Sequence, residues 1–119
     1  MQGVEELFDP ADVADLDVRF AAVAAAVTAH AAATAEDLAR RRIPVVALAV
    51  APTWVTIDFS DGTVIHAFGV DPALAHALGS MGHADPILTA VDWVSAQPRL
   101  WFRSAAGEVL LRAERLLTR

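Results

Sequence analysis

A long run of helix-favouring residues, from Pro10 to Arg42, places the strongest constraint on how this chain folds. At 1.5 Å per residue the segment would form a helix about 50 Å long. A globule of 119 residues is only about 35 Å across, so a whole helix of this length cannot lie within it. Asp9-Pro10 marks the start, because Asp accepts hydrogen bonds at an N-cap and Pro is tolerated at the first helical position.

Larger side chains recur along this segment at alternating steps of three and four residues. They are Val13, Leu16, Phe20, Val23 and Val27, and His30 and Thr34 continue the same stripe. This spacing predicts an amphipathic helix that turns the stripe toward the core. Most other positions are Ala, which favours helix and lets another backbone approach closely.

Two arrangements reconcile the long helix with the small globule. Thr34 followed by Asp37 resembles a capping box with Asp in place of Glu, which would break the helix near Thr34 and start a short second helix. Alternatively, the helix is continuous to its end and a second copy of the chain covers the overhang. We expect the break, and both arrangements are compatible with a homodimer. Three consecutive Arg residues, 40–42, suit the negative end of a helix.

A hairpin is predicted between Trp54 and Phe68, because Asp61-Gly62 lies between two segments of high β propensity. A two-residue turn at Asp61-Gly62 fixes which residues share a face of the sheet. On this register the core face carries Val55, Ile57, Phe59, Val64, His66 and Phe68. The other face carries Trp54, Thr56, Asp58, Ser60, Thr63, Ile65 and Ala67.

Turn and cap signals predict the remaining elements. Residues 45–51 form a buried strand, and Asp71-Pro72 starts a short helix that Gly79 closes. Asp85-Pro86 starts a second short helix, although the alternation from Ile87 to Trp93 would also support a strand. Residues 100–103 and 109–112 form a second hairpin. The last residues, 113–119, either extend its second strand or turn helical.

These elements predict one α+β domain over residues 1–119. A long Ala-rich N-terminal helix packs on a mainly antiparallel sheet of about five strands, with two short helices before the C-terminal hairpin.

Charge and composition narrow the range of functions. The net charge of −6 is uneven, because residues 1–39 carry −7 and residues 99–119 carry +3. Acidic and basic ends pair within or between chains, and a pI near 5 disfavours nucleic acid as a partner. Arg supplies every positive charge and the chain has no Lys, Asn or Tyr. That bias indicates a G+C-rich bacterial genome.

The sequence lacks the residues and motifs that several catalytic and binding mechanisms require. Without cysteine there is no disulfide, thiolate nucleophile or cysteine zinc site. No glycine-rich phosphate loop or serine nucleophile elbow is present. The acidic start, with no uninterrupted apolar run of about 18 residues, predicts a cytoplasmic protein that does not bind membranes. We expect no catalytic residue, cofactor or metal.

The histidines are the remaining candidates for chemistry near neutral pH. His30 lies on the helix stripe and His66 on the predicted core face, so both would point into one interior between helix and sheet. There, with Asp58, they would line a pocket for a small ligand or for cofactor-independent catalysis. A core histidine that is only hydrogen-bonded explains the same pattern. A metal site formed by His76, His83 and Asp85 is a further possibility, although their spacing matches no metal motif.

An exposed apolar patch is expected at Trp54 and Ile65 on the outer face of the hairpin. We therefore expect a non-enzymatic bacterial cytoplasmic protein that acts through protein–protein association, as a homodimer with a possible further protein partner. The alternative is the small-ligand pocket with His30 and His66. The sequence does not identify the partner, the ligand, the pathway or the strand order.

Overall fold

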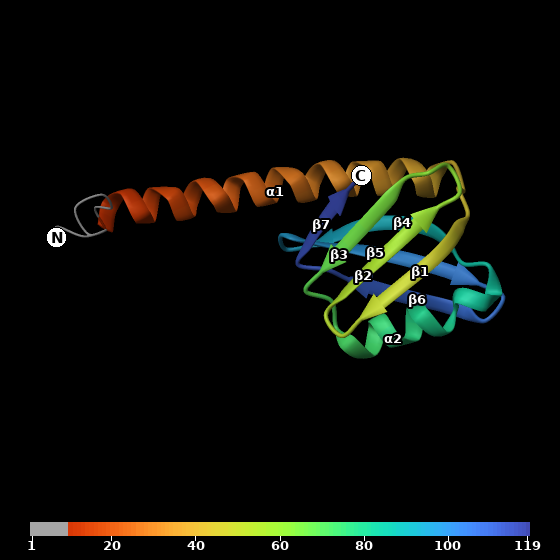
Figure 1. The fold of residues 1–119 in the computed structure, drawn as a ribbon. Coiled ribbons are helices and arrows are strands. Elements are labelled where there is room, and N and C mark those ends of the chain that lie inside the picture. Colours follow the sequence, from red (N-terminus) through yellow and green to blue (C-terminus); the bar gives the residue numbers. More distant parts are fainter. Residues whose placement is uncertain (1–9) are drawn as a thin grey trace.

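The computed structural model describes residues 10–119, with side chains from Val18 onward, and shows an α+β fold with two antiparallel sheets (Figure 1). The strand orders are β1-β2-β3-β7 and β4-β5-β6. The strands are β1 (Val45–Ala51), β2 (Trp54–Phe59), β3 (Val64–Phe68), β4 (Ile87–Val94), β5 (Gln97–Ser104), β6 (Gly107–Arg112) and β7 (Arg115–Thr118). The helices are α1 (Pro10–Arg40), α2 (Pro72–Ser80) and the short 3-10 helix η2 (Gly82–Ala84).

The two sheets face each other, and the helices close the two open sides between them. Helix α1 packs against β7 and β4, whereas α2 packs against β1 and β6. These four strands are the edges of the two sheets, so each helix shields two edges that would otherwise be open to pairing. Side chains from both sheets and both helices form one core, which includes Leu38, Ile57, Ile65, Leu78, Leu100, Phe102, Leu111 and Leu116.

Helix α1 is continuous from Pro10 to Arg40, so the predicted break near Thr34 is wrong. The Thr34 hydroxyl donates to the His30 carbonyl one turn earlier (3.1 Å), a bond that is compatible with an unbroken helix. The helix ends before Arg42, which has a left-handed φ of 55°. The molecule measures 62 × 27 × 26 Å, because the N-terminal part of α1 projects beyond the sheets (Figure 1). The predicted N-cap, Asp9, lies outside the described residues.

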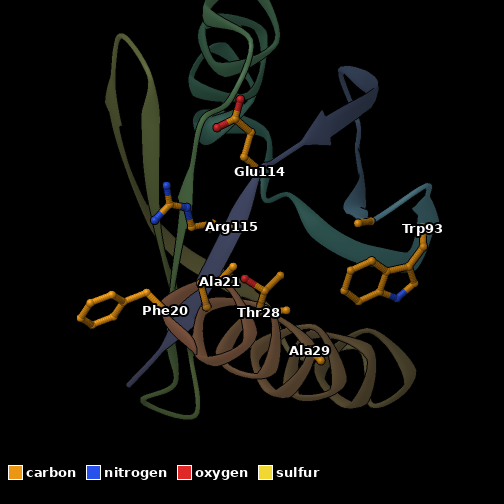
Figure 2. A pocket seen from close by; sticks show the side chains of 10 residues that line it. Phe20, Ala21, Thr28, Ala29, Trp93, Glu114 and Arg115 are labelled. Atoms are coloured by element: carbon orange, nitrogen blue, oxygen red, sulfur yellow. The ribbon is translucent and has the colours of Figure 1, made fainter. Parts of the chain in front are cut away.

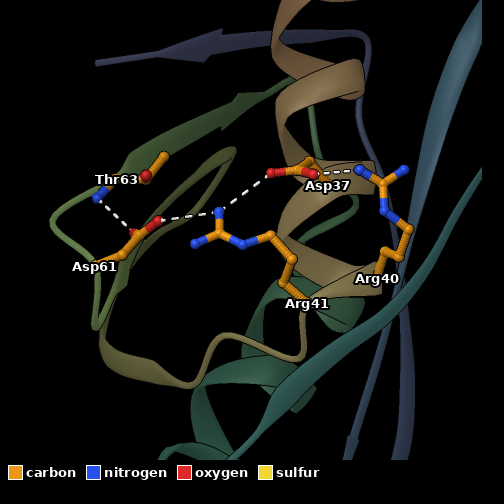
Figure 3. Close-up of polar contacts among 5 residues, drawn as sticks. All are labelled: Asp37, Arg40, Arg41, Asp61 and Thr63. Carbon is orange, nitrogen blue, oxygen red and sulfur yellow. Dashed lines mark hydrogen bonds and ion pairs between the residues drawn. The ribbon is translucent and has the colours of Figure 1, made fainter.

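Ion pairs at the C-terminal end of α1 include one that links it to the first hairpin (Figure 3). Asp37 pairs with Arg40 and with Arg41 (3.1 Å) instead of capping a new helix. Arg41 also reaches Asp61 in the β2–β3 turn (3.9 Å), and Asp61 accepts a hydrogen bond from the Thr63 amide (2.9 Å). That amide bond and the nearby Arg41 hold the pKa of Asp61 below its ordinary value of 3.8. Two of the three consecutive arginines, Arg40 and Arg41, are thus explained by the helix end and its contacts.

The first hairpin forms where it is predicted but in a register shifted by one residue. Its loop has three residues, 60–62, because the Phe59 amide donates to the Thr63 carbonyl and Gly62 adopts a left-handed φ of 90°. Asp-Gly therefore lies in a longer turn that places His66 opposite Thr56. A shift of one residue exchanges the two faces of a strand, so Ile65 and Ala67 are buried and β3 turns His66 and Phe68 outward.

Two further expectations fail in the second half of the chain. Residues 87–94 form strand β4 rather than a helix, and they pair with β5. Asp85 has a left-handed φ of 52°, which is incompatible with an N-cap in its usual extended conformation. Residues 115–118 form a separate strand, β7, which leaves the second hairpin and completes the first sheet beside β3. By contrast, α2 begins as predicted, with the Asp71 carboxylate accepting from the Ala73 amide (2.8 Å).

Strand β1 is also less buried than the sequence predicts. It is the edge strand of the first sheet, and Ala47 and Ala49 on its small-residue face are exposed. The small side chains that allow a close approach belong instead to α1. Its buried positions are Thr28, Ala31, Ala32, Ala35, Leu38 and Ala39.

One buried hydrogen bond joins α1 to the edge strand β7. The Leu116 amide donates to the Thr28 hydroxyl (3.2 Å), and Thr28 is only 4% exposed. The amides of an edge strand that point away from its neighbour need a partner other than the sheet. Thr28 supplies that partner for Leu116.

We expect the substitution Thr28→Val to lower the free energy of unfolding by about 1–3 kcal/mol, because it leaves a buried amide without an acceptor while keeping the side-chain shape. Urea unfolding measures the change. Thr34→Val is the matched control, since the Thr34 hydroxyl bonds only a carbonyl of its own helix, and it should change stability by no more than about 0.5 kcal/mol. Equal effects of the two substitutions would refute the role assigned to Thr28.

Candidate functional site

Large apolar side chains on one flank of α1 are exposed to solvent. Phe20 is 69% exposed, Val23 60% and Val27 38%. The expectation that this stripe faces the core is therefore wrong for its described members, and the side chains of Val13 and Leu16 lie outside the described residues. The sheet edges instead contact the neighbouring face of α1, whose small residues allow the helix axis to lie close to the strands. We call Phe20, Val23 and Val27 the helix stripe.

A second apolar surface lies on the outer face of the first sheet. Trp54 stacks on Phe68 with ring centroids 6.1 Å apart and an angle of 11° between the rings. His66 lies 6.2 Å from Phe68 and 6.3 Å from Trp54, and its Nδ1 is 2.9 Å from the Thr56 hydroxyl. Trp54, Phe68 and Leu117 of β7 remain partly exposed. We call Trp54, His66, Phe68 and Leu117 the aromatic face.

A groove joins the helix stripe to the aromatic face. It has a volume of about 470 Å³, and Val27 of α1 lines it together with Phe68, Arg115 and Leu117. The exposed apolar surface is therefore continuous from the projecting helix across β7 to β3. Apolar surface of this extent, bordered by polar residues, is typical of protein interaction sites.

A larger groove of about 630 Å³ lies beneath the projecting part of α1 (Figure 2). In Figure 2 the helix is drawn at the bottom of the view. Trp93 lies on one side of the groove, Glu114 and Arg115 lie on another, and Phe20 and Thr28 line it from the helix. The groove is apolar apart from these two charged side chains and Thr28. It exists because α1 leaves the body of the protein at this point.

The structure does not place the predicted pocket residues in a shared interior. His30 is exposed on α1, and His66 is half-buried on the aromatic face, where it contacts Thr56. Asp58 is half-buried on the same outer face, opposite Val64. The one-residue shift in the hairpin register moved His66 away from the side of the sheet that faces the core.

The predicted apolar patch is correct at one of its two residues. Trp54 is 41% exposed on the outer face, as expected, whereas Ile65 is completely buried in the core. The outer-face neighbour of Trp54 is instead Phe68, which lies directly opposite it on β3. Sequence reasoning also missed Leu117, because the position of β7 beside β3 has no local signal.

The metal hypothesis finds no support in the described residues. His76 is exposed on α2, His83 lies on η2 and Asp85 follows η2. Among residues 18–119, whose side chains the structure describes, no group of three or more His, Cys, Asp or Glu side chains could hold a metal ion. All three residues are exposed to solvent.

Part of α1 also has the length and composition of a membrane span. The segment Val18–Arg40 has a mean hydropathy of 1.4 over its most apolar window. Helices in protein cores share this property, and the part of this segment from Thr28 to Ala39 packs against the two sheets. That part cannot enter a bilayer while the core is intact.

A network of polar side chains stabilises the β4–β5 hairpin that carries Trp93. Arg99 donates two hydrogen bonds to the Asp92 carboxylate (2.7 and 2.6 Å), and the indole of Trp101 donates a third (3.2 Å). The Arg99 guanidinium also lies 5.5 Å from the centre of the Trp101 ring. These side chains satisfy one another, so we assign them a structural role.

No family model matches this chain, and no curated protein or solved structure is significantly similar to it. The exposed surfaces described above are therefore the features from which a function can be inferred.

We expect the pKa of Asp92 to lie below its ordinary value of 3.8, because Arg99 hydrogen-bonds the charged carboxylate and outweighs the effect of desolvation. The stability that this interaction contributes is complete above the unfolded pKa and is lost as the pH falls through the lower folded pKa. A carbon-13 NMR titration of the carboxyl group measures the value. Arg99→Gln should raise the pKa, and a wild-type pKa at or above 3.8 would contradict this assignment.

Proposed function

We propose that this is a non-enzymatic cytoplasmic bacterial protein that works by protein–protein association, with a second copy of the same chain as its first partner. The observation that supports this most is the helix stripe, in which Phe20 and Val23 stand more than half exposed on a helix that extends beyond the sheets. Exposed residues of this size at regular helical spacing are typical of helices that bind another helix.

The surroundings of the helix stripe support the same proposal. The groove at Val27 connects the stripe to Phe68 and Leu117, so a bound helix would contact the sheet as well as α1. Aromatic residues and Arg are enriched in interface cores, and this surface offers Trp54, Phe68 and Arg115. Helix and sheet together give a larger interface than the helix alone, which a stable dimer needs.

The second candidate function is the binding of a small ligand. The groove beneath α1, with Trp93, Thr28, Glu114 and Arg115, favours it more than the histidines do, because it combines an apolar wall with a few polar groups. Native mass spectrometry distinguishes the two functions, since it reports the number of subunits and any retained small molecule in one spectrum.

We expect the wild type to be a dimer at micromolar concentration and Val23→Glu to weaken the dimer at least about tenfold, because the new carboxylate would be buried without a partner. Size-exclusion chromatography with light scattering over a concentration series measures both. The monomer should remain folded, since Val23 is 60% exposed within one chain.

Ala22→Glu is the matched control, because Ala22 directly precedes Val23, is exposed and points away from the stripe. It should leave the dimer intact. A wild type that is monomeric at micromolar concentration would refute self-association. Flotation of the wild type with lipid vesicles would also contradict the proposal, since the stripe would then bind a membrane.

A further inference from the structure

We propose that two copies of the chain pair through their projecting helices in an antiparallel coiled coil, with Phe20 of each copy packed against Val23 of the other. This inference rests on the proposed self-association and specifies its geometry. It follows from the spacing of the helix stripe, the position of the groove beside it and the distribution of charge along α1.

The spacing of the helix stripe is that of a coiled coil. Phe20 and Val27 are seven residues apart, with Val23 between them, so they occupy positions a, d and a of a heptad. In the sequence Leu16 and Val13 continue the pattern toward the N-terminus. A seam only two residues wide in each heptad is narrower than the stripe of a helix that packs on a sheet. The exposure of Phe20, Val23 and Val27 agrees with this distinction.

One antiparallel register gives each residue of the helix stripe an apolar partner. When Phe20 lies opposite Val23 of the second copy, Leu16 lies opposite Val27, and twofold symmetry makes each contact twice. The positions beside the seam, such as Ala24 and Ala26, are small and allow the two helices to approach closely. Sliding the second helix by one heptad toward either end leaves Val27 without an apolar partner or places Phe20 against His30.

Charge selects the antiparallel direction. The first turns of α1 carry Asp12, Asp15 and Asp17, which a parallel pair would bring together. In the antiparallel register these turns of one copy lie beside residues 26–31 of the other, next to the groove that Arg115 lines. Glu114 lines the same groove, and Arg119, which directly follows β7, adds a second positive charge near this end of the sheet. Opposite charges therefore meet in the antiparallel pair.

The groove between α1 and β7 receives the second helix in this arrangement. Val27, Phe68 and Leu117 form its apolar wall, and its volume is about 470 Å³. The groove extends the contact beyond the coiled coil to the sheet. Each copy supplies one groove and one helix end, so the interface closes on itself as a dimer.

Disulfide mapping tests the register, and the chain suits it because it contains no cysteine. In the double variant Leu16→Cys/Val27→Cys the two thiols of one helix are about 16 Å apart, too far to join within a chain. We expect mild oxidation to convert most of the protein to a covalent dimer. Trypsin cleaves at Arg19 between the two sites, and peptide mapping should show position 16 joined to position 27.

The matched control is Ala22→Cys/Ala33→Cys, which has the same spacing of 11 residues on the side of α1 away from the stripe. It should give little covalent dimer. Links from 16 to 16 and from 27 to 27 would show a parallel pair and overturn this inference. A dimer that forms no disulfide in the first variant would also overturn the register while leaving self-association intact. A monomeric wild type would refute the proposed function itself.

Charge reversal provides an independent test of the direction. We expect Arg115→Glu to weaken the dimer about two- to fivefold at low salt, with the loss shrinking as salt is added. The double variant Arg115→Glu/Asp17→Arg should recover part of that loss, because the opposite charges meet again across the interface. An unchanged dimer in Arg115→Glu at low salt would contradict the placement of the acidic turns beside Arg115.

Discussion

The close contact between the small-residue face of α1 and two sheet edges determines the rest of this structure. Helix α1 has two apolar faces about a quarter-turn apart, one built from Ala and Thr28 and the other from Phe20, Val23 and Val27. The edges of β7 and β4 must be covered, and only the small face lets a helix lie close enough to both. The larger side chains are therefore turned to the flank. The surface available for association follows from how the core is closed.

The sequence predicted local structure well where a cap or turn has a short-range chemical cause. Asp71-Pro72 starts α2, and Asp61-Gly62 lies in a hairpin turn, as expected. The predictions failed where one sequence motif is compatible with two local structures. An Asp-Gly pair is compatible with both a two-residue and a three-residue loop. The additional loop residue shifts the register by one, which exchanges the two faces of β3 and moves His66 to the outer face. Asp85-Pro86 resembles a helix start, yet Asp85 adopts a left-handed conformation and a strand follows.

The candidate site was less predictable than the fold because it depends on contacts between distant segments. Trp54 was recognised as exposed, whereas Phe68 and Leu117 depend on the hairpin register and on the pairing of β7 with β3. The spacing of Phe20, Val23 and Val27 was visible in the sequence. Spacing alone did not reveal whether that stripe faces the chain's own core or the solvent. The stripe is exposed because the Ala-rich face beside it packs against the sheet edges that the stripe would otherwise contact.

The hydrogen bond from Leu116 to Thr28 also has a consequence for the order of folding. It joins residues 88 positions apart, and the neighbouring contacts of α1 with β7 span similar distances along the chain. Contacts between such distant segments form late, because closing a long loop costs entropy before the contacts compensate for it. Helix α1 can form early from local hydrogen bonds, and we expect it to dock after β7 has joined β3. Until then both apolar faces of α1 would be exposed, so in the proposed dimer the helices of two chains would be able to pair before either domain is complete.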